Sequence, residues 1–282
     1  MTRFLHTADW QLGMTRRFLT GEAQNRFTQD RIDSIRRLGE LAREHGAEFM
    51  VVAGDVFETN QVERRTVARA LEALAEVPVP VFLLPGNHDP LDAASVFRSP
   101  GFASRRPSHV IVLDSSEPRP VPGLAGVEVV GAPWPTKRPL RDLVAEAAAG
   151  LAPAPPGMVR VLVGHGAVDA LSPDPEDPAL IVLADAERAL AEGRVHYVAL
   201  GDRHSVTRVG DMGAIWYAGS PVATDFDEEA PGKTLLVELR PGAPPELREL
   251  PVGAWLFVSE TRDLAGIEDV QALARWLAER PE

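Results

Sequence analysis

The 282-residue sequence contains no cysteine, only two tyrosines, and only two lysines, Lys137 and Lys233. The absence of cysteine excludes a disulfide framework and any metal site built on thiolates. No apolar run is long enough to span a membrane, and the first residues lack the long apolar segment of a secretory signal. We therefore expect a cytoplasmic protein with no membrane partner.

Positive charge is also scarce, because 41 acidic residues face 29 basic ones and the formal net charge is −12. A protein that holds duplex DNA on a broad basic face normally shows the opposite balance. The composition therefore counts against tight, autonomous binding of nucleic acid. It leaves room for a nuclease that contacts few phosphates or that relies on the surface of a partner.

Helix-like and strand-like segments alternate along the chain, and this alternation predicts an α/β fold. Apolar residues recur at helical spacing between charged ones over residues 22–45, 61–76 and 140–149. Short buried strands are predicted over residues 3–8, 48–53, 79–84, 159–163 and 195–200.

Beyond residue 224 the sequence becomes rich in strand-like stretches. We expect this part to form a second sheet that closes a sandwich, followed by a small appended unit. Within that unit, a strand is predicted over residues 255–258 and a helix over about residues 267–277.

Each of the five predicted strands runs directly into a polar cluster that can bind metal. In open α/β sheets, ligands bind just beyond the carboxyl ends of the strands. Five strand ends of this kind predict one convergent site. Its candidate residues are Asp9, Gln11, Asp55, Asn87, His88, Asp89, His165, Asp202 and His204.

Each cluster taken alone also has an ordinary structural explanation. Asp9 is a residue type that caps helices and turns, and Gly-Asp at residues 54–55 is a common turn. The Gly-Asn-His-Asp stretch at residues 86–89 has the composition of a polar loop. Turn preference alone does not account for five such clusters at strand ends, which favours the functional interpretation.

The motifs resemble those of the calcineurin-like metallophosphoesterases, and within them those of the SbcD-type nuclease family. The resemblance covers roughly residues 3 to 225. It is carried by residues 6–13 (His-Thr-Ala-Asp-Trp-Gln-Leu-Gly), 54–57 (Gly-Asp-Val-Phe), 86–89, 164–165 (Gly-His), 199–204 (Ala-Leu-Gly-Asp-Arg-His) and 217–221 (Tyr-Ala-Gly-Ser-Pro).

The resemblance implies a four-layer α-β-β-α metallophosphoesterase sandwich with a short C-terminal β-rich αβ appendage. Residues 1–225 would form the phosphoesterase domain. Residues 226–282 would form the β-rich segment and the start of a cap domain, either a partial cap or one that continues in a longer protein.

The resemblance also implies a site for two divalent metal ions, which Asp55 would bridge. The other ligands would be divided between the ions: Asp9, Gln11 and His204 for the first, and Asn87, His165 and Asp202 for the second. A hydroxide shared by the ions would attack phosphorus. His88 would assist the leaving group, held in place by Asp89 or by the backbone.

Two positions depart from the family pattern, which has histidine where this chain has Gln11 and Asp202. Oxygen ligands in place of imidazole favour Mn²⁺, with Mg²⁺ or Fe²⁺ as alternatives, over zinc. A third carboxylate should tighten cation binding and make the shared water less acidic. We expect a more alkaline optimum or a lower turnover. The alternative is that one metal site is weak and the enzyme is slow or degenerate.

Three functions are compatible with these motifs. The first is a metal-dependent DNA nuclease that acts with an SbcC-type ATPase partner, as a monomer or homodimer. The second is a small-molecule phosphodiesterase or phosphatase on the same scaffold, which suits the acidic charge. The third is a binding module without catalysis, motivated by Gln11 and Asp202 and opposed by the presence of Asp55, Asn87, His88 and His165.

Overall fold

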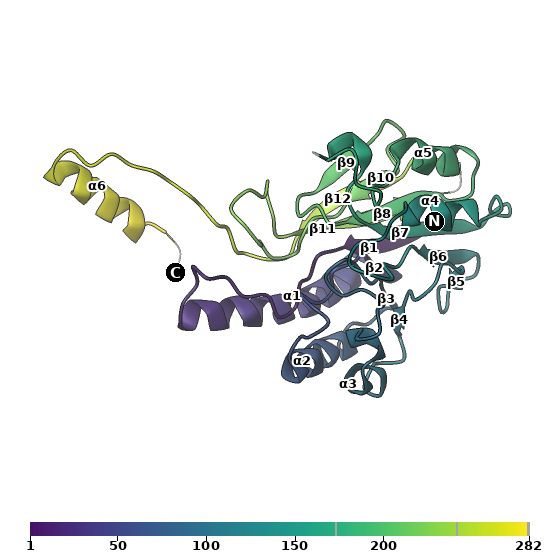
Figure 1. Ribbon diagram of the computed structural model, residues 1–282, viewed down its shortest axis with the longest axis horizontal. Coiled ribbons are helices and arrows are strands. Elements are labelled where there is room, and N and C mark those ends of the chain that lie inside the picture. Colours follow the sequence, from purple (N-terminus) through teal and green to yellow (C-terminus); the bar gives the residue numbers. More distant parts are fainter. Residues whose placement is uncertain (173, 241, 281–282) are drawn as a thin grey trace.

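A computed structural model of the protein describes residues 1–172, 174–240 and 242–280. In this part of the chain the strands form two six-stranded sheets (Figure 1). The first sheet has the order β12-β11-β1-β2-β3-β4, and its strands are β1 (Thr2–Thr7), β2 (Phe49–Val52), β3 (Val81–Leu83), β4 (Val110–Val112), β11 (Lys233–Leu239) and β12 (Glu246–Pro251).

The second sheet has the order β5-β6-β7-β8-β10-β9. Its strands are β5 (Arg119–Pro120), β6 (Val127–Gly131), β7 (Val159–His165), β8 (Tyr197–Gly201), β9 (Thr207–Val209) and β10 (Ile215–Tyr217). The helices are α1 (Glu22–His45), α2 (Arg64–Ala75), α3 (Pro100–Ala103), α4 (Leu143–Ala149), α5 (Leu183–Ala191) and α6 (Ile267–Ala278), with 3-10 turns at Val96–Arg98 and Asp169–Leu171.

The inner faces of the two sheets pack on each other through aromatic and branched side chains. Phe4 of β1 stacks on Phe49 of β2 at a ring distance of 4.8 Å, and its edge contact with Tyr197 of β8 joins the two sheets. Side chains alternate between faces along a strand, so Leu5 points the other way, into the cluster beneath the helices.

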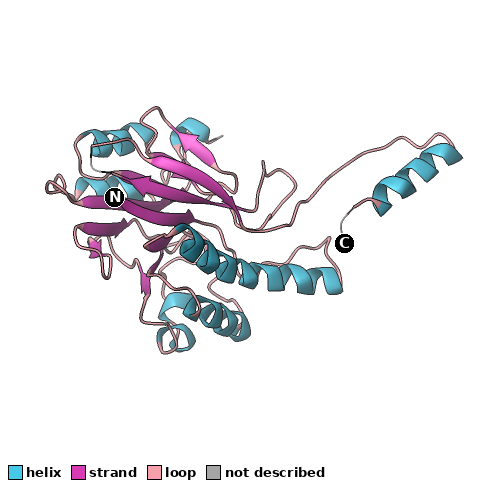
Figure 2. Ribbon diagram, turned by 180° about the vertical axis from the view of Figure 1, so that it is seen from behind, coloured by secondary structure: helices cyan, strands magenta, loops and turns pink. Residues whose placement is uncertain are grey.

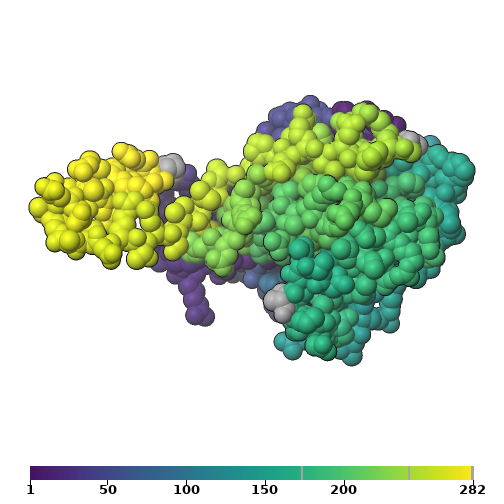
Figure 3. All heavy atoms as spheres, turned by 90° about the horizontal axis from the view of Figure 1, so that it is seen from above, coloured from purple at the N-terminus to yellow at the C-terminus, as the bar shows by residue number. Residues whose placement is uncertain are grey.

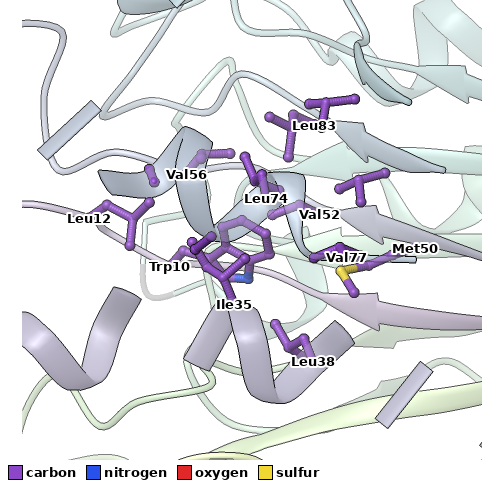
Figure 4. Packing of buried hydrophobic residues seen from close by; sticks show 14 of the residues in the cluster. Trp10, Leu12, Ile35, Leu38, Met50, Val52, Val56, Leu74, Val77 and Leu83 are labelled. Carbon is purple, nitrogen blue, oxygen red and sulfur yellow. The ribbon is translucent and has the colours of Figure 1, made fainter. Parts of the chain in front are cut away.

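The outer face of each sheet is covered by helices (Figure 2). On the first sheet, Ile35 of α1 and Leu74 of α2 pack around Trp10, as Figure 4 shows. On the second sheet, Val144 of α4 and Ala186 of α5 belong to a third buried cluster. The order of layers is therefore α-β-β-α, and the predicted α/β sandwich is confirmed.

Helix α1 covers residues 22–45, as its apolar periodicity predicts. Ile32, Ile35 and Leu38 are buried on one side, and the chain leaves the helix at Gly46 in the left-handed conformation (φ 62°). Helix α2 begins at Arg64, three residues after the predicted start, because the chain first makes a turn in which the backbone nitrogen of Val62 donates to the carbonyl oxygen of Thr59 at 3.1 Å.

The prediction that the chain beyond residue 224 forms the second sheet is wrong. Strand β11 pairs antiparallel with β1, and β12 pairs with β11, so both extend the first sheet. The second sheet is instead built from β5 to β10. The division of the chain at residue 225 stays a prediction, and residues 241, 281 and 282 of the segment that follows lie outside the described part.

The strand predicted over residues 255–258 is also absent from the described residues. Two of its side chains pack on helix α1 instead of pairing with a strand. Trp255 and Phe257 contact the ring of Phe27, and the Trp255 indole donates to Asp30 at 2.6 Å. The alternation of apolar residues over 255–258, which predicted a strand, arises because two side chains pack on a helix.

Helix α6 stands apart from the sandwich at the end of an extended segment, which Figure 3 shows as a separate lobe. None of its described residues is buried. Within the described part of the chain, no helix has the length and apolar character required to cross a membrane.

Candidate metal centre

The carboxyl ends of strands from both sheets meet at one place, because β1, β2 and β3 run parallel in one sheet and β7 and β8 run parallel in the other. Asp9 follows β1, Asp55 follows β2, and Asn87 follows β3. His165 is the last residue of β7, and Asp202 comes directly after β8. The predicted convergence of strand ends is thus the arrangement that the fold produces.

Asp9, Asp55 and His165 form the centre of the cluster. Their ligand atoms lie within 4.8 Å of one another, and all three side chains are buried. Nε2 of His165 is 3.4 Å from Oδ1 of Asp55, and Nδ1 is 4.0 Å from Oδ1 of Asp9. Two buried carboxylates beside one imidazole leave an excess of negative charge unless further positive charge is supplied.

The pKa values of these groups show that demand for positive charge. Burial raises the pKa of Asp9 to about 6, against the opposing effect of His204 and His165. Burial also disfavours the charged form of Asp55, but His165 outweighs it and lowers the pKa of that carboxyl. The pKa of His165 is raised well above its ordinary value, because Asp55 overcomes the effect of burial. A divalent cation bound at this cluster would place positive charge beside these carboxylates.

Asn87 and Asp202 lie on the side of the cluster nearest Nε2 of His165. The Asn87 amide is 2.8 Å from that atom. When the amide is oriented with its nitrogen toward His165 and Asp55, this nitrogen also donates to both carboxylate oxygens of Asp55 at 3.2 Å. Oδ1 of Asp202 is 3.8 Å from Nε2 of His165. The backbone nitrogen of Asp202 donates to both carboxylate oxygens of Asp9 at 3.1 Å.

Gln11 and His204 lie together on the other side, with their Nε2 atoms 3.4 Å apart. The side chain of Gln11 is buried, and among the described residues its Oε1 has no hydrogen-bond partner. A buried acceptor without a partner costs roughly 1–3 kcal/mol, so it indicates a missing donor or cation. This orphaned oxygen, and a donor set of oxygen and imidazole nitrogen, fit divalent metal ions.

Backbone strain is concentrated in this cluster. Asp9, Gln11, Asp55 and Asp202 have positive φ angles of 53°, 42°, 51° and 101°, and among the described non-glycine residues only Ala230 shares this feature. Such conformations cost roughly 1–3 kcal/mol each and persist where the surroundings impose them, typically at functional sites. The unusual backbone conformations therefore coincide with four of the candidate ligands.

His88 is held by the backbone and not by Asp89. Its Nδ1 lies 2.9 Å from the carbonyl oxygen of Glu58, and its backbone nitrogen donates to Oδ1 of Asp55 at 3.0 Å. A carbonyl only accepts, so Nδ1 carries the proton. Nε2 then faces the cluster, 4.0 Å from Oδ2 of Asp55.

Asp89 is buried and joins two loops. Its carboxylate accepts from the backbone nitrogens of Gly86 at 2.8 Å and Phe57 at 2.9 Å. Burial and the nearby Asp55 raise the pKa of Asp89 to about 7. Gly86 is required beside it, because a Cβ at that position would lie 2.3 Å from Oδ1 of Asp55.

Two residues near the cluster, Glu228 and Arg31, were not predicted from the sequence. Glu228, in the loop between β10 and β11, lies 3.0 Å from Nδ1 of His204. Arg31 of α1 is fully buried and donates to the backbone oxygens of Trp10 (2.7 Å) and Ala223 (3.2 Å). An acid in a polar loop and an arginine in a charged helix normally face solvent, so their positions emerge only from the fold.

A sequence profile of the calcineurin-like phosphoesterases matches residues 2–237. The chain therefore belongs to the calcineurin-like phosphoesterase family, and it is a metal-dependent phosphoesterase. The predicted resemblance and the predicted enzyme class are confirmed.

Curated relatives with similar sequences are named as nuclease subunits or as a DNA repair protein. The chain is 27% identical over 260 residues to the SbcD subunit of the nuclease SbcCD from Escherichia coli K12, a match that covers 80% of this chain and 62% of that protein. It is 25% identical to the Bacillus subtilis protein of the same name, covering 98% of this chain and 75% of that one. A 90-residue stretch is 33% identical to the DNA double-strand break repair protein Mre11 of Archaeoglobus fulgidus, covering 31% of this chain and 19% of that protein. The matched region spans less than two thirds of the Escherichia coli protein.

Solved structures share the fold at low sequence identity. The protein TT1561 of Thermus thermophilus aligns with a TM-score of 0.53 and 12% identity, covering 89% of this chain and 99% of that one. A Staphylococcus aureus structure described as a proposed 5′-nucleotidase aligns with a TM-score of 0.55 and 12% identity, covering 99% of this chain and 58% of that one. These matches show the fold alone.

Proposed function

We propose that this chain is a two-metal phosphodiester hydrolase that degrades DNA. The observation that carries the proposal is the buried cluster of Asp9, Asp55 and His165 at the carboxyl ends of strands from both sheets. A DNA substrate is proposed because the curated relatives over most of the chain are named nucleases.

In this proposal Asp55 is shared between two divalent ions. Asp9, Gln11 and His204 hold one ion, and Asn87, His165 and Asp202 hold the other. Bound there, the ions would stabilise charge on the phosphate oxygens and lower the pKa of a water molecule. Oxygen donors are in the majority, which favours Mn²⁺, with Mg²⁺ and Fe²⁺ as alternatives.

His88 is the proposed proton donor to the leaving oxygen. Its Nδ1 is committed to the carbonyl of Glu58, and only Nε2 is free to hold a proton at the cluster. The imidazole is half-exposed, as a group that meets substrate must be. Asp89 affects the position of His88 indirectly, because its carboxylate hydrogen-bonds the 86–89 loop to the backbone of Phe57.

We propose that a partner supplies part of the DNA-binding surface. The net charge of −12 gives the isolated chain little attraction for a phosphate backbone. An ATPase of the SbcC type is the proposed partner, because the relatives are named as subunits of SbcCD nucleases. A homodimer would present two such centres.

The proposal is tested by Mn²⁺-dependent degradation of end-labelled linear DNA, measured beside hydrolysis of bis-p-nitrophenyl phosphate. Asp55→Asn should abolish both, and Asp263→Asn, an exposed carboxylate in the extended segment, should leave both unchanged. Intact DNA with hydrolysis of the small diester would support a small-molecule phosphodiesterase, which the acidic charge favours, or a nuclease that needs a cap or a partner to hold DNA. Loss of neither activity in Asp55→Asn would contradict the proposed centre.

A further inference from the structure

Glu228 lies in the loop between β10 and β11, far in sequence from the strand ends that carry the candidate ligands. Its side chain is 6% exposed, although three of its neighbours, Asp225, Phe226 and Asp227, face solvent. A carboxylate that is withdrawn from water in an otherwise exposed loop needs hydrogen-bond partners.

Those partners are His204 and Thr224. Oε1 of Glu228 is 3.0 Å from Nδ1 of His204. The backbone nitrogen of Thr224 donates to both carboxylate oxygens, at 2.9 and 3.1 Å, and the Thr224 hydroxyl donates to Oε1. The same hydroxyl oxygen lies 2.6 Å from Nδ1 of His204.

These contacts determine which nitrogen of His204 carries the proton. An ionised carboxylate only accepts hydrogen bonds, so Nδ1 is the donor. Nε2 is then the atom presented to the cluster. The amide nitrogen of Gln11, a donor, faces that Nε2 at 3.4 Å, which independently matches a ring with its lone pair at Nε2.

The loop that carries Glu228 is fixed to the cluster at several points. The hydroxyl of Ser220 donates to the carbonyl oxygen of Asp9 at 2.9 Å. The guanidinium of Arg31 donates to the carbonyl oxygen of Ala223, and the backbone nitrogen of Glu229 donates to Ser205. The loop that holds Glu228 against His204 is therefore also bonded to the backbone of Asp9.

We propose that Glu228 is a positioning residue, which orients His204 and fixes its Nε2 as a metal ligand. This inference rests on the proposed two-metal function and adds a residue outside the predicted ligand set. Carboxylates behind metal-binding imidazoles commonly act in this way, and their loss typically weakens metal binding about 10–100-fold.

The test uses three variants of the 282-residue chain and Mn²⁺ as the probe. Glu228→Gln removes the charge, and because the amide can donate as well as accept, it can pair with a protonated or an unprotonated Nδ1 of His204. Thr224→Val removes the hydroxyl with little change in shape. Glu229→Gln is the matched control, because it removes the same charge from an adjacent, exposed side chain. Mn²⁺ binding is measured by calorimetry, and the His204 tautomer by long-range ¹H–¹⁵N correlation NMR without metal.

In Glu228→Gln, one of two Mn²⁺ sites should weaken about 10–100-fold while the other is retained, and the single Nδ1-protonated form of His204 should become a mixture. Thr224→Val should weaken the same site to a smaller degree, and Glu229→Gln should match the wild type. Unchanged Mn²⁺ binding and tautomer in Glu228→Gln would overturn the inference, as would equal weakening of both sites with a lowered melting temperature. A wild-type chain that binds no Mn²⁺ would instead overturn the proposed function.

Discussion

Nδ1 of His165 lies 2.9 Å from the backbone carbonyl oxygen of Ala53. Because a carbonyl only accepts, Nδ1 carries a proton, and Nε2 is directed at Asp55 and Asn87. Ala53 directly follows β2 and lies two residues before Asp55. The end of this strand in the first sheet therefore positions both its own carboxylate and an imidazole from the second sheet. The two halves of the sandwich are thereby coupled at the candidate metal centre.

The absence of a side chain at Gly54 lets the His165 ring lie against the backbone of residues 53–54. Gly54→Ala should displace the ring. A Cβ at this position would lie 2.1 Å from Nδ1 of His165, and the residue has a φ of +93°. The positive φ should cost roughly 1–2 kcal/mol in the free energy of unfolding. The steric overlap should cost roughly 1–3 kcal/mol more and displace the imidazole. We expect loss of Mn²⁺ binding and of phosphodiester hydrolysis, measured by calorimetry and with bis-p-nitrophenyl phosphate.

Gly123→Ala provides the matched control for this substitution. Gly123 has a similar φ of +83° but open space around its Cβ position. It should show only the smaller loss of stability and retain activity. Equal effects of the two substitutions would show that backbone strain, and not the contact with His165, is what Gly54 relieves.

Asp202→His should move the pH dependence of hydrolysis to lower pH. Asp202 adds a negative charge 3.8 Å from Nε2 of His165, and its removal leaves more positive charge beside the bound water. The acidic limb of the pH–rate profile should therefore move down, with a higher rate near pH 7. Asp211→His, in an exposed turn, controls for the change of residue type. An unchanged profile in Asp202→His would argue against the electrostatic effect assigned to Asp202.

His6 should make folding stability depend on pH below neutrality. Burial lowers the pKa of His6 to about 3, against the effect of its hydrogen bond to Leu200, whereas the unfolded chain keeps a value near 6.5. Between these two pH values, His6 is therefore protonated in the unfolded state and neutral in the folded state. The stability is fully present above pH 6.5 and is lost as the pH falls toward 3.

At pH 5 this loss should amount to roughly 2 kcal/mol relative to pH 8. His6→Gln should reduce the pH dependence by that amount, because glutamine keeps a donor and an acceptor for Tyr197 and Leu200 but does not titrate. Chemical denaturation of both proteins at pH 5, 6.5 and 8 measures the difference. Parallel stability curves for wild type and variant would refute the assignment.

Arg31 should stabilise the loops around the cluster through its planar guanidinium. Burial lowers its pKa to about 10, so it stays charged at neutral pH while donating to the carbonyls of Trp10 and Ala223. Arg31→Lys replaces two separated donor nitrogens by a single one and should lower the free energy of unfolding by roughly 2 kcal/mol. Arg37→Lys, on the exposed side of the same helix beside Glu40 and Glu44, should change it by less than about 0.5 kcal/mol. Similar losses for both variants, measured by urea denaturation, would contradict this role.

The layers of the fold and the position of the site could be predicted from local sequence. Helix α1 is amphipathic over its whole length, and the buried strands are short apolar runs that end in glycine and polar residues. Because parallel strands of one sheet align their carboxyl ends, the strand assignments alone place Asp9 near Asp55. His165 joins them only through the packing of the second sheet against the first. The ligand role of each residue stays a prediction that metal binding must test.

The remaining features depend on contacts between distant segments. Strand β11 pairs with β1 across more than 200 residues, and nothing in its own alternation distinguishes that edge from one of the second sheet. Glu228 and Arg31 belong to segments whose composition is typical of solvated surface. Their burial follows from contacts between the 222–232 loop and His204 and between that loop and helix α1, which no local pattern encodes.

The central claim is that one buried cluster holds two divalent metal ions around Asp55. Crystals soaked in Mn²⁺ and measured at the manganese edge test it most directly. We predict two anomalous peaks in wild-type crystals, both in contact with Asp55, one beside Asp9, Gln11 and His204 and the other beside Asn87, His165 and Asp202. No peak at the cluster, or a single peak that Asp55→Asn leaves in place, would contradict the account.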